Sequence, residues 1–220
     1  MTDGILLIDK PAGISSFGVV SRIRRVLSER AGKKIKVGHT GTLDPFATGL
    51  MIIVIGKECK NASNYSKLDK TYEATVCLGS TSSTGDPEGD IAQISDMQPS
   101  LNEIKRIIEQ FIGDEIEQIP PMFSAIKIDG QRAYKLAREG KKIDMPVRKI
   151  TIYSLEIVNY SYPELKIKTR VSSGTYIRTL AVDIGENLGI GAYCSQLRRA
   201  NIANWSVNEA KQLSDLGIND

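Results

Sequence analysis

The amino-acid sequence predicts an α+β fold, with a central and mostly antiparallel sheet flanked by helices. Strand-like and helix-like segments alternate irregularly, which does not fit the regular β-α-β repeat of a doubly wound fold. Two strand-like segments, 147–160 and 164–172, are joined through Tyr162-Pro163, as expected of an antiparallel hairpin. The 220 residues are 41% hydrophobic and 25% charged, which is enough apolar material for one globular core. We therefore expect residues 1–220 to form one domain.

Each predicted element has its own sequence signal. Strands are assigned where β-branched and apolar residues form a continuous run or alternate with polar ones. Helices are assigned where apolar residues recur every three or four positions. The predicted strands are residues 5–9, 51–55, 71–78, 147–160 and 164–172. The predicted helices run from Ser15 or Ser16 to Gly32, over 101–111 and 131–139, from 177 to 189, and onward from Ser206. Ser100 with Glu103, and Ser206 with Glu209, have the spacing of capping boxes. Prolines within 118–124 interrupt any helix there and begin a long excursion.

Composition excludes several classes of protein. The three cysteines are odd in number and form no CxxC pair, and His39 is the only histidine, so neither a disulfide framework nor a metal site is expected. The N-terminus is too short and too acidic for a signal peptide. No apolar run approaches the length that spans a membrane. We expect a cytoplasmic protein without metal or organic cofactor.

Basic residues are concentrated in one segment although the net charge is only +3. The segment from 22 to 36 contains a single acidic residue, Glu29, and seven basic ones, which are Arg22, Arg24, Arg25, Arg30, Lys33, Lys34 and Lys36. Such a segment can neutralise several phosphates of a nucleic acid. It can equally be the solvated face of a helix that runs into a loop.

Three glycines, one proline and the only histidine, His39, fall within the twelve residues 38–49. Asp44 is followed by Pro45, and this pair is common at helix starts, with Asp as N-cap and Pro at the first helical position. Asp44 can therefore be a cap or a catalytic carboxylate. His39 can satisfy a local hydrogen bond or contact a ligand. Residues 38–41 also match the GxxG loop of KH domains, but without the KH order of elements.

Six motifs in one order make the chain similar to the TruB family, the tRNA pseudouridine-55 synthases. The motifs are residues 10–16, 38–45, 70–72, 119–125, 174–179 and 197–199, and they span nearly the whole chain. The resemblance implies a pseudouridine synthase fold with an active-site cleft across the sheet. It also implies that the partner is the T-arm stem-loop of tRNA, in which the uridine at position 55 is isomerised.

The resemblance also implies roles for single residues. Asp44 matches the catalytic aspartate, Arg178 its ion-pair partner, and Tyr72 the aromatic residue over the target base. His39, Leu197, Tyr176 and Lys10 match substrate-binding positions. The excursion 118–148 matches the loop that closes over the RNA. From the residues alone, Tyr72 can also be a core residue of its strand, and Arg178 can cover a helix start.

The expected chemistry suits these residue types. The reaction breaks the glycosidic bond of uridine, turns the uracil and joins its C5 to C1′, with no redox change. A carboxylate can act as nucleophile or as ion-pair stabiliser, and an arginine can keep it ionised and aimed. The base must first be flipped out of the stack, between Tyr72 and Leu197 as walls. We expect a monomer without an obligate protein partner.

Two departures from the family and two rival functions remain. Family members commonly carry a C-terminal RNA-binding PUA domain, for which this chain, ending at Asp220, has no room. Ser83 stands before Thr84-Gly85-Asp86, where the family often has an acidic residue, which puts one RNA contact in doubt. The rivals are an RNA-binding or RNA-folding module, and a family member acting on another RNA.

Overall fold

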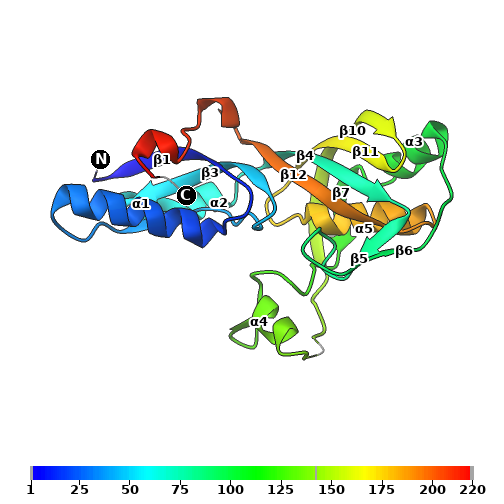
Figure 1. Ribbon diagram of the computed structural model, residues 1–220, viewed down its shortest axis with the longest axis horizontal. Helices are drawn as coiled ribbons and strands as arrows, with labels where there is room; N and C mark the ends of the chain where they lie inside the picture. Colours follow the sequence, from blue (N-terminus) through cyan, green and yellow to red (C-terminus); the bar gives the residue numbers. More distant parts are fainter. Residues whose placement is uncertain (1, 142, 219–220) are drawn as a thin grey trace. The chain divides into compact units, whose positions relative to one another are not determined.

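The computed structural model describes residues 2–141 and 143–218 (Figure 1). The chain divides into two compact units. Unit 1 comprises the described residues of Met1–Tyr72 and Arg198–Asp220, and unit 2 comprises those of Glu73–Leu197. Two strands, β4 (Lys70–Leu78) and β12 (Ala192–Ile202), belong partly to each unit.

Unit 1 is built around strand β3 (Thr48–Ile55), whose apolar side chains are almost all buried. Strands β1 (Gly4–Lys10) and β2 (Val37–His39) pair with β3 antiparallel, and the end of β12 pairs with it in parallel. The pairing of β12 requires Gly49, because a Cβ on this residue would collide with the backbone of Arg199. Strand β13 (Trp205–Ser206) pairs with β12.

Helix α1 (Ser16–Ala31) is the long helix of unit 1. Ser15 caps its start by accepting a hydrogen bond from the Gly18 amide, and Gly32 ends it in the left-handed conformation. Its apolar face, which includes Val19, Val20 and Ile23, is buried as the periodicity predicts. The rest of unit 1 is formed by α2 (Ala62–Ser66) and the 3₁₀ segments Gly56–Asn61, Val207–Glu209 and Ser214–Leu216.

Unit 2 contains a sheet in which the strands follow the order β12, β4, β11, β10, β7. The bounds of the last three are Glu164–Val171, Arg148–Ser161 and Gly113–Gln118. Strands β10 and β11 form the predicted antiparallel hairpin through Tyr162-Pro163 (Figure 1). Alternate residues of β11 are buried, which makes one face of this hairpin part of the core. Helix α3 (Leu101–Glu109) contacts β10 and helix α5 (Ile177–Asn187).

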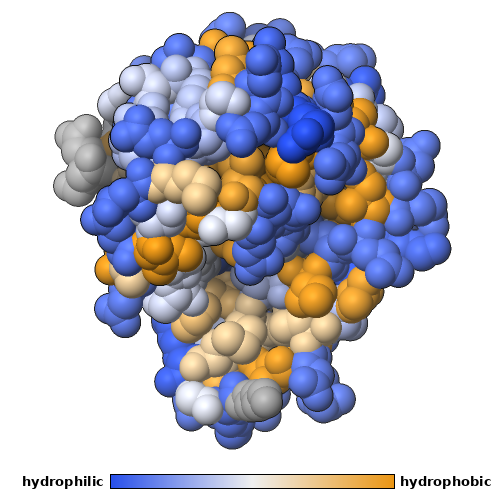
Figure 2. Space-filling model, turned by 90° about the vertical axis from the view of Figure 1, so that its right-hand side faces the viewer, coloured by the Kyte–Doolittle hydropathy of each residue, from blue (hydrophilic) through white to orange (hydrophobic). Residues whose placement is uncertain are grey.

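Smaller elements of unit 2 lie in its loops. Strands β5 (Ser80–Ser82) and β6 (Ile91–Gln93) form a hairpin. The excursion 118–148 holds β8 (Lys127–Ile128), β9 (Gln131–Arg132) and α4 (Ala133–Arg138). The end of unit 2 that faces the viewer in Figure 2 is a mixed surface, with hydrophobic residues interspersed among hydrophilic ones. No helix in the described part of the chain is long and apolar enough to cross a membrane.

The predicted fold class and most predicted elements are confirmed, but one alternative and one expectation are wrong. No helix begins at Asp44: the chain turns there, with the Ala47 amide donating to the Asp44 carbonyl, and then enters β3. The helix expected from Ser206 is only a three-residue 3₁₀ turn, although the capping box of Ser206 and Glu209 is formed. The capping box of Ser100 and Glu103 does begin a helix.

Candidate active site

Asp44 lies in a loop whose backbone is held at several points by other parts of unit 1. Ser16, at the start of α1, accepts a hydrogen bond from the Leu43 amide at 2.7 Å and donates one to the Leu43 carbonyl at 2.9 Å. The carbonyl of Pro45 accepts hydrogen bonds from the Gly13 amide at 2.8 Å and from Lys10 at 3.2 Å. Both neighbours of Asp44 are therefore fixed, and its position is determined without a helix.

Two fully buried cations hold this loop through backbone carbonyls. The Lys10 ammonium has no exposed surface and also donates to the carbonyls of Pro11 and Ile14, each at 2.8 Å. Arg199, which is 1% exposed, donates to the carbonyls of Leu50 at 2.6 Å and Gly41 at 3.1 Å. In this structure Lys10 positions the loop, and the substrate contact expected of it stays a prediction.

His39 ends strand β2 and is half-buried. Burial lowers the pKa of His39, and the positive charge of Arg199 lowers it further, against an opposing hydrogen bond with the Gly41 backbone. The imidazole is therefore neutral near pH 7. Its Nδ1 is buried without a hydrogen-bond partner. A neutral ring suits insertion between bases better than it suits contact with phosphate.

Lys70 and Tyr72 are neighbours on β4, and both side chains are buried. Tyr72 is 8% exposed, so its ring is part of a packed surface. The Lys70 ammonium donates to the carbonyls of Ser66 and Leu68. Burial, followed by the positive charge of Arg199, lowers the pKa of Lys70 to about 8.

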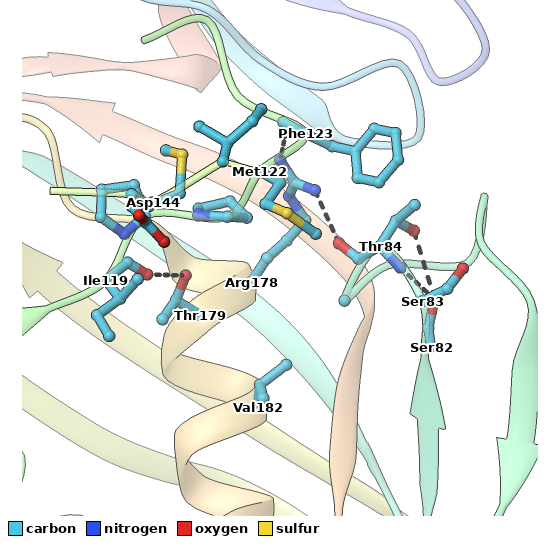
Figure 3. A pocket seen from close by; sticks show the side chains of 15 residues that line it. Ser82, Ser83, Thr84, Ile119, Met122, Phe123, Asp144, Arg178, Thr179 and Val182 are labelled. Carbon is cyan, nitrogen blue, oxygen red and sulfur yellow. Dashed lines mark hydrogen bonds between the residues drawn. The ribbon is translucent and has the colours of Figure 1, made fainter. Parts of the chain in front are cut away.

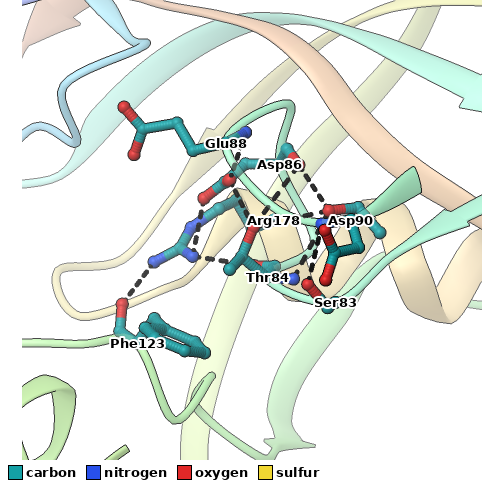
Figure 4. Close-up of polar contacts among 8 residues, drawn as sticks. Ser83, Thr84, Asp86, Glu88, Asp90, Phe123 and Arg178 are labelled. Atoms are coloured by element: carbon teal, nitrogen blue, oxygen red, sulfur yellow. Dashed lines mark hydrogen bonds and ion pairs between the residues drawn. The ribbon is translucent and has the colours of Figure 1, made fainter. Parts of the chain in front are cut away.

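In unit 2, Arg178 lies at the start of α5 and is fixed by a network that sequence reasoning did not identify (Figure 4). Its guanidinium donates to the Asp86 carboxylate and to the Thr84 carbonyl, both at 2.9 Å, and to the Phe123 carbonyl at 2.8 Å. Asp86 also accepts from the Thr84 hydroxyl at 2.5 Å and from the Glu88 amide at 3.0 Å. Both members of the ion pair are 3% exposed.

Arg178 also lines a pocket of about 550 Å³ within unit 2 (Figure 3). One wall is the polar loop 82–85, another is α5, and the third comes from residues of the excursion 118–148, including Ile119. Thr179 donates to the Ile119 carbonyl at 3.4 Å, which joins two of these walls. The excursion is thus connected both to Arg178 and to the helix that carries it.

The other two predicted substrate-binding residues also lie in unit 2. Tyr176 precedes α5, and its backbone exchanges two hydrogen bonds with the Gln118 side chain, at 2.8 and 3.1 Å. Leu197 lies on β12 and is 8% exposed. Tyr176 and Leu197 therefore belong to unit 2, whereas Asp44 and Tyr72 belong to unit 1. The pairing of Asp44 with Arg178 stays a prediction.

The predicted RNA-binding stretch lies along α1 and the loop that follows. Arg25, Arg30, Lys33, Lys34 and Lys36 are exposed, whereas Arg22 and Arg24 are half-buried. Over the described residues, none of these seven cations forms an ion pair with an acidic side chain. Their charges are thus available to an anionic partner. Across 2–141 and 143–218, no group of three or more His, Cys, Asp or Glu side chains is placed to hold a metal ion.

Three comparisons with known proteins agree. The family described as TruB family pseudouridylate synthase (N terminal domain) matches residues 24–177. The tRNA pseudouridine synthase B of Aquifex aeolicus (strain VF5) is 46% identical over 215 residues, which is 97% of this chain and 73% of that protein. The protein of the same name from Azoarcus sp. (strain BH72) is 42% identical over 98% of this chain and 70% of its own length.

Among solved structures, the crystal structure of a Cbf5-Nop10-Gar1 complex matches with a TM-score of 0.75 and 26% identity. The match covers 97% of this chain and 53% of that chain, so the present chain spans about half the length of the solved one. The archaeal box H/ACA Nop10-Cbf5 complex, 24% identical with a TM-score of 0.70, has the same fold. Sequence, fold and the arrangement of the motif residues lead to one conclusion: the chain belongs to the TruB family of pseudouridylate synthases.

Proposed function

We propose that this protein isomerises uridine to pseudouridine at position 55, in the T-arm loop of tRNA, with Asp44 as the catalytic carboxylate. The observation that carries the proposal is the loop around Asp44, whose backbone is held on both sides by Ser16, Lys10 and Gly13. A carboxylate that must meet one atom of a flipped nucleotide needs such a fixed backbone. Membership of the family and two relatives named tRNA pseudouridine synthase B support the reaction and the substrate.

The reaction rearranges one nucleotide and needs no other reactant. The bond from C1′ of the ribose to N1 of uracil breaks, a bond from C1′ to C5 forms, and the proton on C5 is replaced by one on N1. Asp44 either adds to the sugar or the ring, or balances the positive charge that develops on the sugar. Both routes need an ionised carboxylate in a fixed place.

Arg178 is proposed to act on Asp44 by charge. Its guanidinium is held by Asp86, Thr84 and Phe123, so it can present a fixed positive charge without adjusting during the reaction. The Phe123 carbonyl belongs to the excursion 118–148, which is proposed to close over the RNA. Closure of this excursion over the RNA would then also position Arg178.

The remaining residues are proposed to hold the flipped base. Tyr72 and Leu197 provide an aromatic and an aliphatic wall for the uracil. His39, kept neutral by burial and by Arg199, is proposed to help displace the target nucleotide from the folded loop. Tyr176 is proposed to bind substrate from the start of α5. In this proposal, residues 1–220 act as one catalytic domain, as a monomer and in the cytoplasm.

The test is Asp44→Asn, because this change removes the charge and keeps the shape. No helix begins at Asp44, so loss of a helix cap cannot explain an effect. Single-turnover conversion of a T-arm stem-loop should vanish while its binding isotherm is preserved. Conversion at a rate comparable with the wild type would refute the catalytic assignment. Mapping pseudouridine in total tRNA, with and without the gene, separates this function from an RNA-folding module and from action on another RNA.

A further inference from the structure

Phe17, the second residue of α1, exposes a large aromatic side chain that the folded core does not use. It is 65% exposed, the highest fraction given for any large hydrophobic residue in the described part of the chain. Its neighbours on the same helix, Val19 and Val20, are buried. The hydrophobic stripe of the helix is therefore complete without Phe17, and packing does not account for a phenylalanine here.

One guanidinium group lies over this ring. Arg24 lies two turns further along the helix on the same side, and its Cζ is 6.0 Å from the ring centroid, in the range of a cation–π contact. A hydrogen bond of 3.2 Å from Arg24 to the Val37 carbonyl fixes that guanidinium. Arg22 lies beside Gly18, where a Cβ would stand only 3.3 Å from its Nη1. Gly18 thus leaves room for the Arg22 guanidinium on the first turns of α1.

The backbone that carries Phe17 is attached to the loop that carries Asp44. Phe17 directly follows Ser16, the residue whose hydroxyl is bonded to both backbone groups of Leu43. Leu43 precedes Asp44. The start of α1 is therefore rigidly connected to the Asp44 loop. A ligand group bound at Phe17 would have a fixed position relative to that loop.

We propose that Phe17, with Arg24, is a stacking site for an unpaired nucleobase of the substrate RNA, separate from the pocket of the target uridine. This inference rests on the proposed function, because it assumes an RNA substrate. Arg24 covers one face of the ring, and the exposed fraction leaves the other face open. Any base can stack on an aromatic face, and an adjacent guanidinium can bind the phosphate of the same nucleotide. The site therefore takes an unpaired nucleotide beside the target uridine and holds the loop in place.

The experiment compares the wild type with single-residue variants on a T-arm stem-loop, in which each unpaired position in turn carries the fluorescent base 2-aminopurine. The variants are Phe17→Ala, Phe17→Tyr and, as a control, Val158→Ala, which shortens an apolar side chain of similar exposure (63%) on β10. Phe17→Ala should raise the Kd by about fivefold or more, as removal of one base-stacking residue does. Phe17→Tyr, which keeps the ring, and the control should stay near the wild-type Kd.

Two further readouts separate stacking from charge. Binding should quench 2-aminopurine at one position in the wild type and not in Phe17→Ala. The dependence of log K on log salt should keep its slope in Phe17→Ala, since no phosphate contact is lost, whereas the exposed Arg25→Ala should flatten it.

An unchanged Kd for Phe17→Ala, or quenching that does not depend on Phe17, would overturn the inference. A change in sedimentation of Phe17→Ala without RNA would do so too, because it would place a second copy of the chain on this ring. The proposed function is tested separately, through pseudouridine formation by the wild type and its loss in Asp44→Asn. An enzyme that is active but indifferent to Phe17 refutes only the stacking site. An inactive protein whose RNA binding depends on Phe17 refutes only the proposed reaction.

Discussion

Replacement of Asp86 by asparagine tests whether the buried network around Arg178 is part of the catalytic machinery. Asp86 and Arg178 are each 3% exposed and their charged atoms are 2.9 Å apart. The change keeps the side chain's size and one acceptor oxygen, but it removes the negative charge and puts an amide N–H₂ or a neutral oxygen against the guanidinium. Removing one partner of a buried ion pair costs about 3–5 kcal/mol. Since domains are stable by about 5–15 kcal/mol, this cost is a large share of the free energy of unfolding.

The expected outcome for Asp86→Asn is a loss of about 3 kcal/mol in the free energy of unfolding, together with a large loss of single-turnover rate. Urea unfolding measures the first quantity and a T-arm stem-loop assay the second. Asp90→Asn is the matched control, because Asp90 is exposed on the same loop and is hydrogen-bonded through its backbone: its amide donates to the Ser83 hydroxyl and its carbonyl accepts from the Ser83 amide. Stability within about 1 kcal/mol of the wild type and a normal rate for Asp86→Asn would refute this reasoning.

Three further predictions concern single side chains. Lys10→Met should lower the free energy of unfolding by at least about 1–3 kcal/mol, measured by urea titration, because carbonyls that include that of Pro45 lose a buried donor. Arg178→Lys should lose most of its single-turnover rate although the charge is kept, since an ammonium cannot reach three separate acceptors with a planar fork. Burial, and then the charge of Glu186, raise the pKa of Asp183 to about 6. Its folded-state pKa lies above the unfolded value, so stability is lost as the pH rises through about 6. The thermal midpoint of Asp183→Asn should then exceed that of the wild type at pH 7.5 and match it at pH 3.5, in paired melts.

Local sequence signals correctly predicted features that depend on interactions between residues close together in the sequence. Ser100 and Glu103 form the predicted capping box because both partners lie within one helical turn. The Asp44-Pro45 pair allowed a helix start for the same kind of reason, and there that alternative was wrong. The carbonyl of Pro45 accepts hydrogen bonds from Lys10, 35 residues earlier in the chain, and from Gly13. These tertiary hydrogen bonds fix the turn, and no local propensity reports them.

Strands β7 and β12 were missed for related reasons. Strand β7 carries Asp114, Glu115 and Glu117, whose acidic side chains are unfavourable in strands, and it forms because it pairs with β10. Strand β12 contains two adjacent arginines. Arg198 forms an ion pair with Asp9 at 2.8 Å, 189 residues away in sequence, and Arg199 is bonded to carbonyls of β3 and of the Asp44 loop. Because the polar residues of this strand bind partners so distant in sequence, the strand shows no recognisable alternation of apolar and polar residues.

Motif residues from the N-terminal and the C-terminal segment of unit 1 all bind the backbone of the same region. Lys10 and Ser16 lie near the start of the chain and Arg199 near its end, and all three bind backbone groups of residues 41–50. A helix or strand would satisfy such backbone groups internally, but it would also fix the direction of the side chains it carries. A loop held by side chains from outside lets Asp44 point where the reaction requires. Such anchoring residues need not touch the substrate, yet a change in any of them displaces the carboxylate, and catalysis is more sensitive to this displacement than stability is. In the proposed function, Lys10, Ser16 and Arg199 therefore support the Asp44 carboxylate, whereas Tyr72, Leu197 and Tyr176 contact the substrate.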